Sequence, residues 1–591
     1  MLRIAVANHA KLSWLLIRGA MRRVTGRANS HPFLRWPLPA LRSDRLLIAP
    51  PDLRTADATR ASEIYSGRFV FAGKVVICDG RSIFEMEPPS DDWGAALLGF
   101  GWLRHLRAAD SAITRANARA LVDEWIALQG TWHPIAWRPG VLSRRIISWL
   151  SQSTLILQDA DARFYRRFLR SLVRQVRYLR HTAGDARRGV DRMQAVVALC
   201  YAALCIAGQA RHIKAATDRL SQEIERQILP DGGHVSRDPS AIIEILIEFL
   251  PLRQTFTARN IAPPRALLNA IDRMMPMLRF FRHSDGSFAH FNGMGATPGG
   301  LLSTLLAYDE THGMPLSNAP HSAYQRLEAH GAVLIVDTGR APPIEVSLDA
   351  HAGCLAFEFS SPKQSLIIVN CGMPATGREN WRQFARSTAA HSAVTLNNVS
   401  SARFVEMATL KRMLGGSPML GGPRHVAVTR EDRPDAVVLR AAHDGYADRF
   451  DIIHERALIL ASDGTRLDGE DVFLDAGGSP QVRTTKDAFA VRFHLHPTVK
   501  ATRLSDGHGV MLMLPNKEVW TFSAYEDQVE LEDSVYLAGS EGPRRTAQIV
   551  IRGRARTASR VQWSLQQAPP GALVSTGPAR RAREEEPRLP L

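Results

Sequence analysis

The pattern of apolar and polar positions changes once along the chain. From about residue 93 to residue 315, apolar residues recur at spacings of three and four, as in ANARALVDEWIALQG (116–130) and ARFYRRFLRSLVRQVRYLRHT (162–182). This period is that of amphipathic helices. Seven or eight such segments follow one another, separated by short polar or Gly/Pro-containing joints, and together they predict a helical array.

After about residue 322 the period becomes two. Short runs such as HGAVLIVDTG (330–339), SLIIVNCG (365–372) and RTAQIVIRG (545–553) are bounded by Gly, Pro, Asn and Asp, which is typical of strands. Many such runs predict a large antiparallel sheet or sandwich. A small hairpin or cover segment is expected near 65–85, where short apolar runs alternate with glycine.

These patterns predict a multidomain chain of α and β parts. We expect a basic N-terminal segment (1–60), a helical domain (61–320), an antiparallel β-sandwich domain (321–567) and a disordered charged tail (568–591). A helical half followed by a β half also favours a ligand cleft between the two.

The composition narrows the class of protein. Of the 591 residues, 45% are hydrophobic and 22% are charged, which is the range of globular proteins. No run approaches the roughly 20 apolar residues of a membrane span, so we expect no integral membrane segment. The five cysteines are scattered and odd in number, which excludes a regular disulfide framework and a CxxC metal pair.

The net charge of +16, carried mostly by arginine, favours a polyanionic partner: an acidic polysaccharide, nucleic acid or a membrane surface. A generally basic, solvated surface explains the same charge. No helix-turn-helix, zinc-finger or RNP-like pattern is present, so we expect no nucleic-acid partner. The N-terminus, MLRIAVANHAKLSWLLIRGAMRRV, has a short apolar run and no clear cleavage site, which argues against an ordinary signal peptide.

One histidine stands out in RSTAAHSAVTLN (386–397), where small and hydroxylic residues surround His391. Such a histidine either forms hydrogen bonds within its own sheet or belongs to a site. The surrounding motifs bear on this choice. They are ILPDGGHVSRDPS (228–240), AHAGCLAFEFS (350–360), IIVNCG (367–372), WRQFARSTAAHSAVTLN (381–397), HDGYADRFDIIHERAL (443–458), LDGEDVF (467–473) and RFHLHP (492–497).

Together with the helical-then-β order, these motifs resemble the heparinase II/III-like polysaccharide lyases, over about residues 65–555. The resemblance implies an (α/α) toroid-like helical array followed by a β-sandwich. It also implies cleavage of a uronic-acid-containing acidic polysaccharide by β-elimination, and a location in the cell envelope or periplasm. Because a clear signal peptide is missing, a cytoplasmic location stays open. The oligomeric state is not predicted.

The chain departs from the family pattern at several positions. The β half of the family typically begins His-x-His-x-Asp-x-x-x-Phe, whereas this chain has Asp349, His351, Gly353 and Phe357. In some members a histidine, an aspartate and the histidine of the AAH motif bind zinc, and the positions here are His351, Asn370 and His391. An amide is a poorer zinc ligand than a carboxylate. We therefore predict no certain cofactor and leave a structural zinc ion open.

The usual catalytic residues are also replaced in the helical half. Gly189, Val190 and Asp191 stand where the family has an Asn-His pair, and Ala241 stands near the position of its tyrosine. We predict a substitute catalytic set in which His234 exchanges protons with Asp191 or Asp238. A neighbouring carboxylate would fix the tautomer of the imidazole. The predicted catalytic residues are His234, Arg237, Asp191 and His391.

A second predicted set binds substrate. Arginines can hold carboxylates or sulfates, and Phe288 can stack on a sugar from the Gly-rich segment 284–300. The set comprises Arg188, Arg282, Phe288, Asn292, Arg382 and Arg386. Structural roles remain open for several of the residues: His234 as the cap of a turn, Asp238 as a helix N-cap, and 284–300 as a connector.

Two functions follow. The first is a lyase that acts on an acidic polysaccharide. The second is a non-catalytic polysaccharide-binding scaffold of the cell envelope, which the missing tyrosine and Asn-His pair favour.

Overall fold

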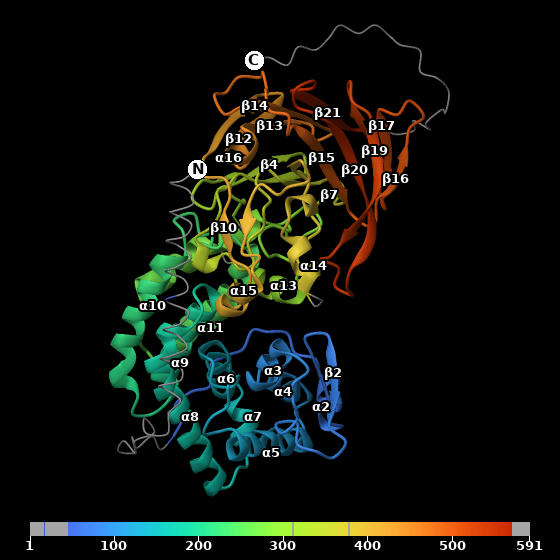
Figure 1. The fold of residues 1–591 in the computed structure, drawn as a ribbon. Coiled ribbons are helices and arrows are strands. Elements are labelled where there is room, and N and C mark those ends of the chain that lie inside the picture. The colour runs from blue at the N-terminus through green and yellow to red at the C-terminus, as the bar shows by residue number, and fades with distance from the viewer. Residues whose placement is uncertain (1–16, 18–44, 310–312, 376–378, 570–591) are drawn as a thin grey trace.

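The computed structural model describes residue 17 and residues 45–309, 313–375 and 379–569. Helices fill the first half of the chain and antiparallel strands the second, which confirms the predicted fold class (Figure 1). Most of the predicted N-terminal segment and nearly all of the predicted charged tail lie outside the described residues.

The helical half contains long amphipathic helices and one small hairpin. Its elements are α2 (Thr59–Tyr65), β1 (Arg68–Phe71), β2 (Lys74–Ile77), α3 (Asp91–Leu98), α4 (Leu103–Ala109), α5 (Ala112–Leu128), α6 (Pro139–Ser151), α7 (Ser153–Leu157), α8 (Ala162–Thr182), α9 (Val190–Cys205), α10 (Ile213–Gln227), α11 (Pro239–Ala258), α12 (Arg265–Phe280) and α13 (Gly299–Ala307). The strands β1 and β2 pair antiparallel within the region where the sequence indicated a hairpin.

Local signals fix where these helices begin. Ser111 and Thr114 form a reciprocal capping box at the start of α5, and the Asp161 side chain accepts two backbone N–H groups at the start of α8. The apolar face of α8 then packs inward, with Phe168 and its neighbours on that face buried. In the core, the Trp149 ring lies 5.5 Å from Trp125 and 5.0 Å from Phe168.

The β half is a sandwich of two antiparallel sheets. One has eight strands in the order β11 (Val426–Asp432), β12 (Ala436–His443), β13 (Ile452–Ala461), β14 (Arg466–Asp475), β21 (Arg560–Gln567), β18 (Val519–Ala524), β17 (Gly509–Met513) and β16 (Lys500–Arg503). The other has nine: β19 (Val529–Tyr536), β20 (Arg544–Arg554), β15 (Ala488–Leu495), β7 (Leu366–Val369), β6 (Phe357–Ser360), β5 (Ala332–Asp337), β4 (Tyr324–Ala329) and β3 (Asn318–Ala319), with β8 (Val394–Leu396) paired to β15.

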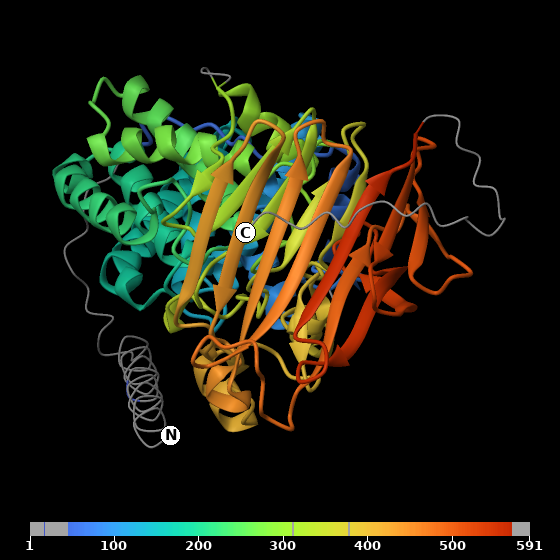
Figure 2. The ribbon, with the colours of Figure 1, turned by 90° about the horizontal axis from the view of Figure 1, so that it is seen from above.

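The nine-stranded sheet is covered on both faces. Along β5, Val333 and Ile335 belong to the core of the helical half, whereas Leu334 and Val336 belong to the core between the two sheets. The strand is therefore apolar at successive positions, as expected for a strand without a solvent face. The protein thus has three layers, with helices behind one sheet and the second sheet in front (Figure 2).

Smaller elements decorate the sandwich on the side that meets the helices. They are the 3₁₀ turns η4 (Ile344–Val346) and η5 (Thr388–Ala390), the helices α14 (Glu379–Ala385), α15 (Ala408–Leu414) and α16 (Ala447–Phe450), and the two-stranded ribbon β9 (Arg403–Phe404) and β10 (Met419–Gly421).

A buried ion pair joins the two halves. The Arg237 guanidinium, just before α11, lies 2.5 Å from a carboxylate oxygen of Asp337 at the end of β5. It also donates to the carbonyls of Ser322 and Ala323 and lies 4.6 Å from the centre of the Tyr324 ring. The side chains of the pair are 10% and 3% exposed, so neither charge is free to take water as its partner.

The DGG segment before it forms a second contact between the halves. The Asp231 carboxylate accepts the backbone N–H groups of His321 and Ser322 and the Ser322 hydroxyl. A Cβ at Gly233 would lie 1.8 Å from the Ser322 Oγ, so only glycine allows this approach. The motif therefore holds the domains together.

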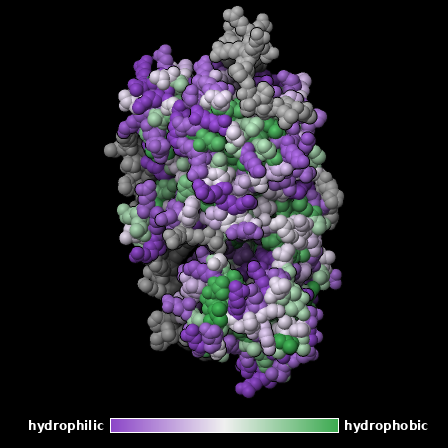
Figure 3. Space-filling view, turned by 90° about the vertical axis from the view of Figure 1, so that its right-hand side faces the viewer, coloured by the Kyte–Doolittle hydropathy of each residue, from purple (hydrophilic) through white to green (hydrophobic). Residues whose placement is uncertain are grey.

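The surface is mixed in character. The face in Figure 3 is mostly hydrophilic, with scattered apolar patches and a recess between its upper and lower parts. None of the helices in the described ranges combines the length and apolar character that crossing a lipid bilayer requires.

We expect Arg237→Ala to lower the free energy of unfolding by about 3–5 kcal/mol, because it leaves the Asp337 carboxylate buried without a counter-charge. Urea denaturation followed by tryptophan fluorescence measures this. Arg545→Ala is the control, since the Arg545 side chain is 88% exposed in its ion pair with Asp533. Equal losses in the two variants would contradict a structural role for the buried pair.

Candidate functional site

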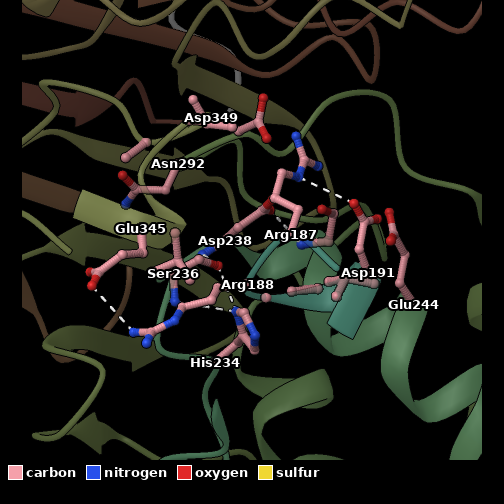
Figure 4. Close-up of a pocket in the computed structure, with 17 residues that line it drawn as sticks. Arg187, Arg188, Asp191, His234, Ser236, Asp238, Glu244, Asn292, Glu345 and Asp349 are labelled. Atoms are coloured by element: carbon pink, nitrogen blue, oxygen red, sulfur yellow. Dashed lines mark hydrogen bonds and ion pairs between the residues drawn. The ribbon is translucent and has the colours of Figure 1, made fainter. Parts of the chain in front are cut away.

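A pocket of about 130 Å³ lies where the two halves meet (Figure 4). The helical half contributes the start of α9, the loop 231–238 and the first turns of α11. The β half contributes residues 345–350, around η4, and Asn292 comes from the segment between α12 and α13. This is the interdomain position where the sequence favoured a cleft. We name it the interdomain pocket.

Acidic side chains outnumber basic ones in the interdomain pocket. Its lining contains two arginines, Arg187 and Arg188, and five acidic residues: Asp191, Asp238, Glu244, Glu345 and Asp349. Both arginines are already paired, Arg187 with Asp191 at 3.3 Å and Arg188 with Glu345 at 3.2 Å. The pocket therefore presents carboxylate oxygens more readily than free cations.

His234 is buried and neutral. Its Nδ1 accepts the backbone N–H of Ser236 at 3.2 Å and lies 2.6 Å from the Ser236 hydroxyl. Its Nε2 therefore carries the proton and donates to the Gln227 side-chain oxygen at 2.9 Å. Burial lowers the pKa of His234 to about 4. Both ring nitrogens are engaged, and the expected neighbouring carboxylate is replaced by the amide of Gln227.

Asp238 caps a helix and also lines the pocket. Its carboxylate accepts the Ser240 N–H at 2.8 Å at the start of α11, which agrees with the N-cap alternative. Desolvation raises the pKa of Asp238 well above its usual range, and the hydrogen bond from Ser240 offsets this only in part. The carboxyl therefore gives up its proton less readily than that of an exposed aspartate. Asp191, the other predicted proton partner, lies in the same pocket beside Arg187.

Two of the three predicted metal ligands, His351 and His391, contact each other directly. His391 donates from Nδ1 to the Ser387 carbonyl, so its Nε2 accepts the Nδ1 proton of His351 at 2.9 Å. The Nε2 of His351 in turn accepts the Gly293 N–H. Burial lowers the pKa of His391 to about 4 and holds that of His351 well below its usual range. All four ring nitrogens are engaged.

This arrangement does not fit a zinc ion, because no imidazole lone pair is free to bind it. The side-chain oxygen of Asn370 is occupied by the Ser392 N–H. Across the part of the chain that the structure describes, no group of three His, Cys, Asp or Glu residues could hold a metal. His391 is thus a buried, hydrogen-bonded histidine, but its partners Ser387 and His351 lie in loops and not in the sheet that the first interpretation of its motif named.

The predicted substrate-binding residues are divided between the pocket and the interior. Arg188 and Asn292 line the pocket, and Arg382 is paired at 2.6 Å with Asp349, which also lines it. The remaining residues lie outside the pocket lining: Arg282, Phe288 with 0% exposure, and Arg386, which donates to the carbonyls of Ser347, Ala350 and Ser417. As placed, Phe288 has no open face for a sugar.

Several pocket residues were missed by sequence reasoning. Arg187, Glu244 and Glu345 belong to no family motif quoted above, although Glu244 lies about one turn after the helix-start signal of α11. A buried cluster was missed as well. Glu358 on β6 lies 3.1 Å from the His283 ring and 3.2 Å from the His290 ring, both in the segment after α12. Burial opposes its ionisation, but His290 and His283 outweigh this and hold its pKa below the usual range.

Comparisons with known proteins agree with this architecture. The family described as Heparinase II/III-like, C-terminal, matches residues 311–564. Among curated proteins, the chain is 29% identical over 538 residues to the FtsZ-localized protein C of Caulobacter vibrioides, covering 89% of this chain and 91% of the relative.

Solved structures with the same fold include lyases. A crystal structure titled Heparinase III matches with a TM-score of 0.69, at 14% identity over 93% of this chain and 91% of that one. A mutant of the heparan sulfate lyase HepC from Pedobacter heparinus matches with a TM-score of 0.61, at 14% identity over 95% and 88%. At this identity the match concerns the fold alone.

We expect His234→Gln to make the protein less sensitive to acid. The folded pKa of His234 is depressed from 6.5 to about 4, so the unfolded chain takes up a proton first as the pH falls. The stability that His234 contributes is thus present above pH 6.5 and is lost between pH 6.5 and 4. Between pH 6.5 and pH 4, unfolding of the variant should therefore take up about one proton fewer than unfolding of the unaltered protein.

Urea unfolding measured from about pH 7 to about pH 4 gives the change of the unfolding free energy with pH. His181→Gln is the control, because His181 is exposed. If the unfolding free energy of His234→Gln changed with pH as steeply as that of the unaltered protein, a neutral His234 would be contradicted.

Proposed function

We propose, from the match of residues 311–564 to the heparinase II/III-like C-terminal family, that this chain is a polysaccharide-binding protein whose interdomain pocket does not carry out β-elimination. The fold and the family match support membership of the polysaccharide lyase family. The non-catalytic role is our proposal, and its support is that acidic residues outnumber arginines in the pocket lining and that both arginines are paired with acids.

β-Elimination next to a uronate carboxylate makes three demands. A positive or neutral donor must stabilise the developing enolate, a base must take the C5 proton, and an acid must protonate the leaving oxygen. In this pocket both arginines are paired with acids, and the histidine has no free ring nitrogen. The pocket has no tyrosine in its lining.

The same side chains suit the binding of sugar hydroxyls. Carboxylate oxygens accept hydrogen bonds from hydroxyl groups, and charge-assisted bonds of this kind are the stronger ones. Ser236, Ser240 and Asn292 add neutral polar atoms to the lining. We therefore propose that the pocket holds a hydroxyl-rich stretch of a polysaccharide, while the arginines remain with their acidic partners.

A lyase is the second candidate, and one observation favours it. Desolvation raises the pKa of the Asp238 carboxyl well above its usual range, which suits it to donate a proton to a substrate carboxylate or to a leaving oxygen. An acidic polysaccharide remains the substrate that this candidate requires. It needs a base that none of the predicted residues supplies in the present arrangement.

We expect no unsaturated uronate from any member of a panel of acidic polysaccharides, because both pocket arginines are paired with acids and neither a free imidazole nor a tyrosine lines the pocket. Ultraviolet absorbance of the unsaturated product measures this, with a heparinase on its own substrate as the positive control. Binding to the same polymers and to neutral polymers is followed by affinity electrophoresis. Rising absorbance that disappears in Asp238→Asn would replace this proposal by the lyase.

Absence of both cleavage and binding would contradict a polysaccharide function altogether. Asp533→Asn is a suitable control for Asp238→Asn, since the Asp533 side chain is 88% exposed and lies outside the pocket.

The FtsZ-localized relative supports a role at the cell envelope. The similarity covers nearly the whole length of that relative and therefore includes both halves of this chain. We propose that this chain also associates with FtsZ and thereby brings a polysaccharide-binding domain to the envelope.

We expect the purified chain to sediment with FtsZ filaments and to stay in the supernatant when FtsZ is kept unassembled. Sedimentation and gel quantification measure this. Equal recovery in the pellet with and without filaments would contradict the association.

A further inference from the structure

A second, larger hollow lies on the other side of one wall of the interdomain pocket. Its volume is about 920 Å³, and its lining includes edge strand β11, Arg340 and the two prolines that follow it. In the loop 234–238, His234, Ser236 and Asp238 face the interdomain pocket, while Val235 and Arg237 line this second hollow. We name it the basic groove.

The basic groove has the opposite charge to the pocket. Its lining contains four arginines and two histidines and no aspartate or glutamate. Arg237 is committed to Asp337, and Arg424 is paired with Asp448. Arg340 is exposed, and its guanidinium has no ion pair among the described residues. The groove thus offers a free cation to an anionic ligand.

One wall of the groove is an unpaired strand edge. β11 is the last strand of its sheet, with β12 on one side only. The Arg433 N–H donates to the Ala436 carbonyl in the turn between them, and the register pairs Thr429 with Arg440. In an antiparallel pair the hydrogen-bonded positions alternate along each strand, so the main-chain N–H and C=O groups of the odd-numbered residues of β11 point toward β12.

The N–H and C=O groups of Val426, Val428 and Arg430 therefore point away from β12, on the side of the free edge. All three residues line the groove. The Arg430 side chain donates to the carbonyls of Ser317 and Arg326, which closes one end of the groove toward β3 and β4. Five residues of β11 span about 17 Å, enough for one short segment of chain.

The remaining wall is suited to a peptide. Outside β11 the lining includes three prolines and two alanines, and it has no tryptophan, tyrosine or phenylalanine on which a sugar ring could stack. Gln325, on β4, lines the groove, is 5% exposed, and its buried Oε1 accepts no hydrogen bond among the described residues. A ligand N–H would satisfy such an acceptor.

We propose that the basic groove binds an extended, acidic peptide segment of a partner protein, which adds to the free edge of β11 as a further strand. Main-chain hydrogen bonds to Val426 and Val428 supply affinity, and Arg340 selects for acidic side chains. The proposal for this groove does not rest on the proposal for the polysaccharide pocket, and its failure would leave the latter untouched.

Random linear peptides displayed on phage are panned against the full chain, and selected peptides are synthesised for fluorescence anisotropy. We expect enrichment in Asp and Glu and a loss of affinity of about tenfold to a hundredfold in Arg340→Glu. Arg545→Glu is the control for charge reversal, because Arg545 lies on β20 outside the groove.

Val428→Pro tests strand addition. It removes an N–H that faces the free edge, so the ladder with β12 is kept and peptide affinity should fall at least about tenfold. Asp432→Pro is its control for orientation, since residue 432 has the same orientation in the register but lies outside the groove, and Asp432→Ala measures separately the loss of the Asp432 ion pair with Arg430. Thermal unfolding of each variant checks that the fold is intact.

N-methylation of alternate peptide residues provides a second readout. One set of positions should abolish binding and the other should leave it unchanged, because only one edge of the added strand faces β11. Failure to select any peptide, or peptides that bind Val428→Pro and Arg340→Glu as well as the unaltered chain, would overturn the proposal. Binding of heparin fragments that is sensitive to Arg340→Glu but not to Val428→Pro would replace the peptide by an anionic saccharide.

Discussion

The buried contact between Arg237 and Asp337 is the constraint on which both sites depend. A charged pair taken out of water must be completely satisfied by hydrogen bonds. Arg237 meets this requirement with three carbonyls in addition to the carboxylate, and Asn292 donates to the second oxygen of Asp337. Arg237 adopts a left-handed conformation, with φ of 64°, although it is not glycine. The surrounding contacts hold it there, and they fix the loop that separates the pocket from the groove.

Hydrogen bonding also explains why the histidines that the sequence predicted for the site are poor catalysts in this arrangement. His234, His351 and His391 each use both ring nitrogens within the protein. A neutral imidazole whose lone pair already accepts a proton donor has little tendency to take another proton or a metal. These residues contribute order to the domain boundary. The side chains left to meet a ligand in the pocket are mainly carboxylates and hydroxyls.

The sequence predicts the fold well because the spacing of apolar residues is set by which face of each helix or strand is buried. The helical repeat of 162–182 and the strand runs near 330–339 both become the expected elements. The site is harder to predict, since motif position does not reveal which partner a side chain will find. Arg237 belongs to the DGGH motif region, yet its partner, Asp337, is 100 residues away. Phe288 looks like a stacking residue in a glycine-rich segment, and only tertiary packing shows that its ring is covered.

The wall shared by the pocket and the groove has a thermodynamic consequence. Alternate residues of 234–238 line the pocket and the groove. The loop 338–350 also contributes to both, with Arg340 in the lining of the groove and Asp349 in that of the pocket. A ligand that shifts this wall from one side changes the free energy of binding on the other. Linkage makes any such coupling reciprocal, so each ligand would alter the affinity for the other by the same factor.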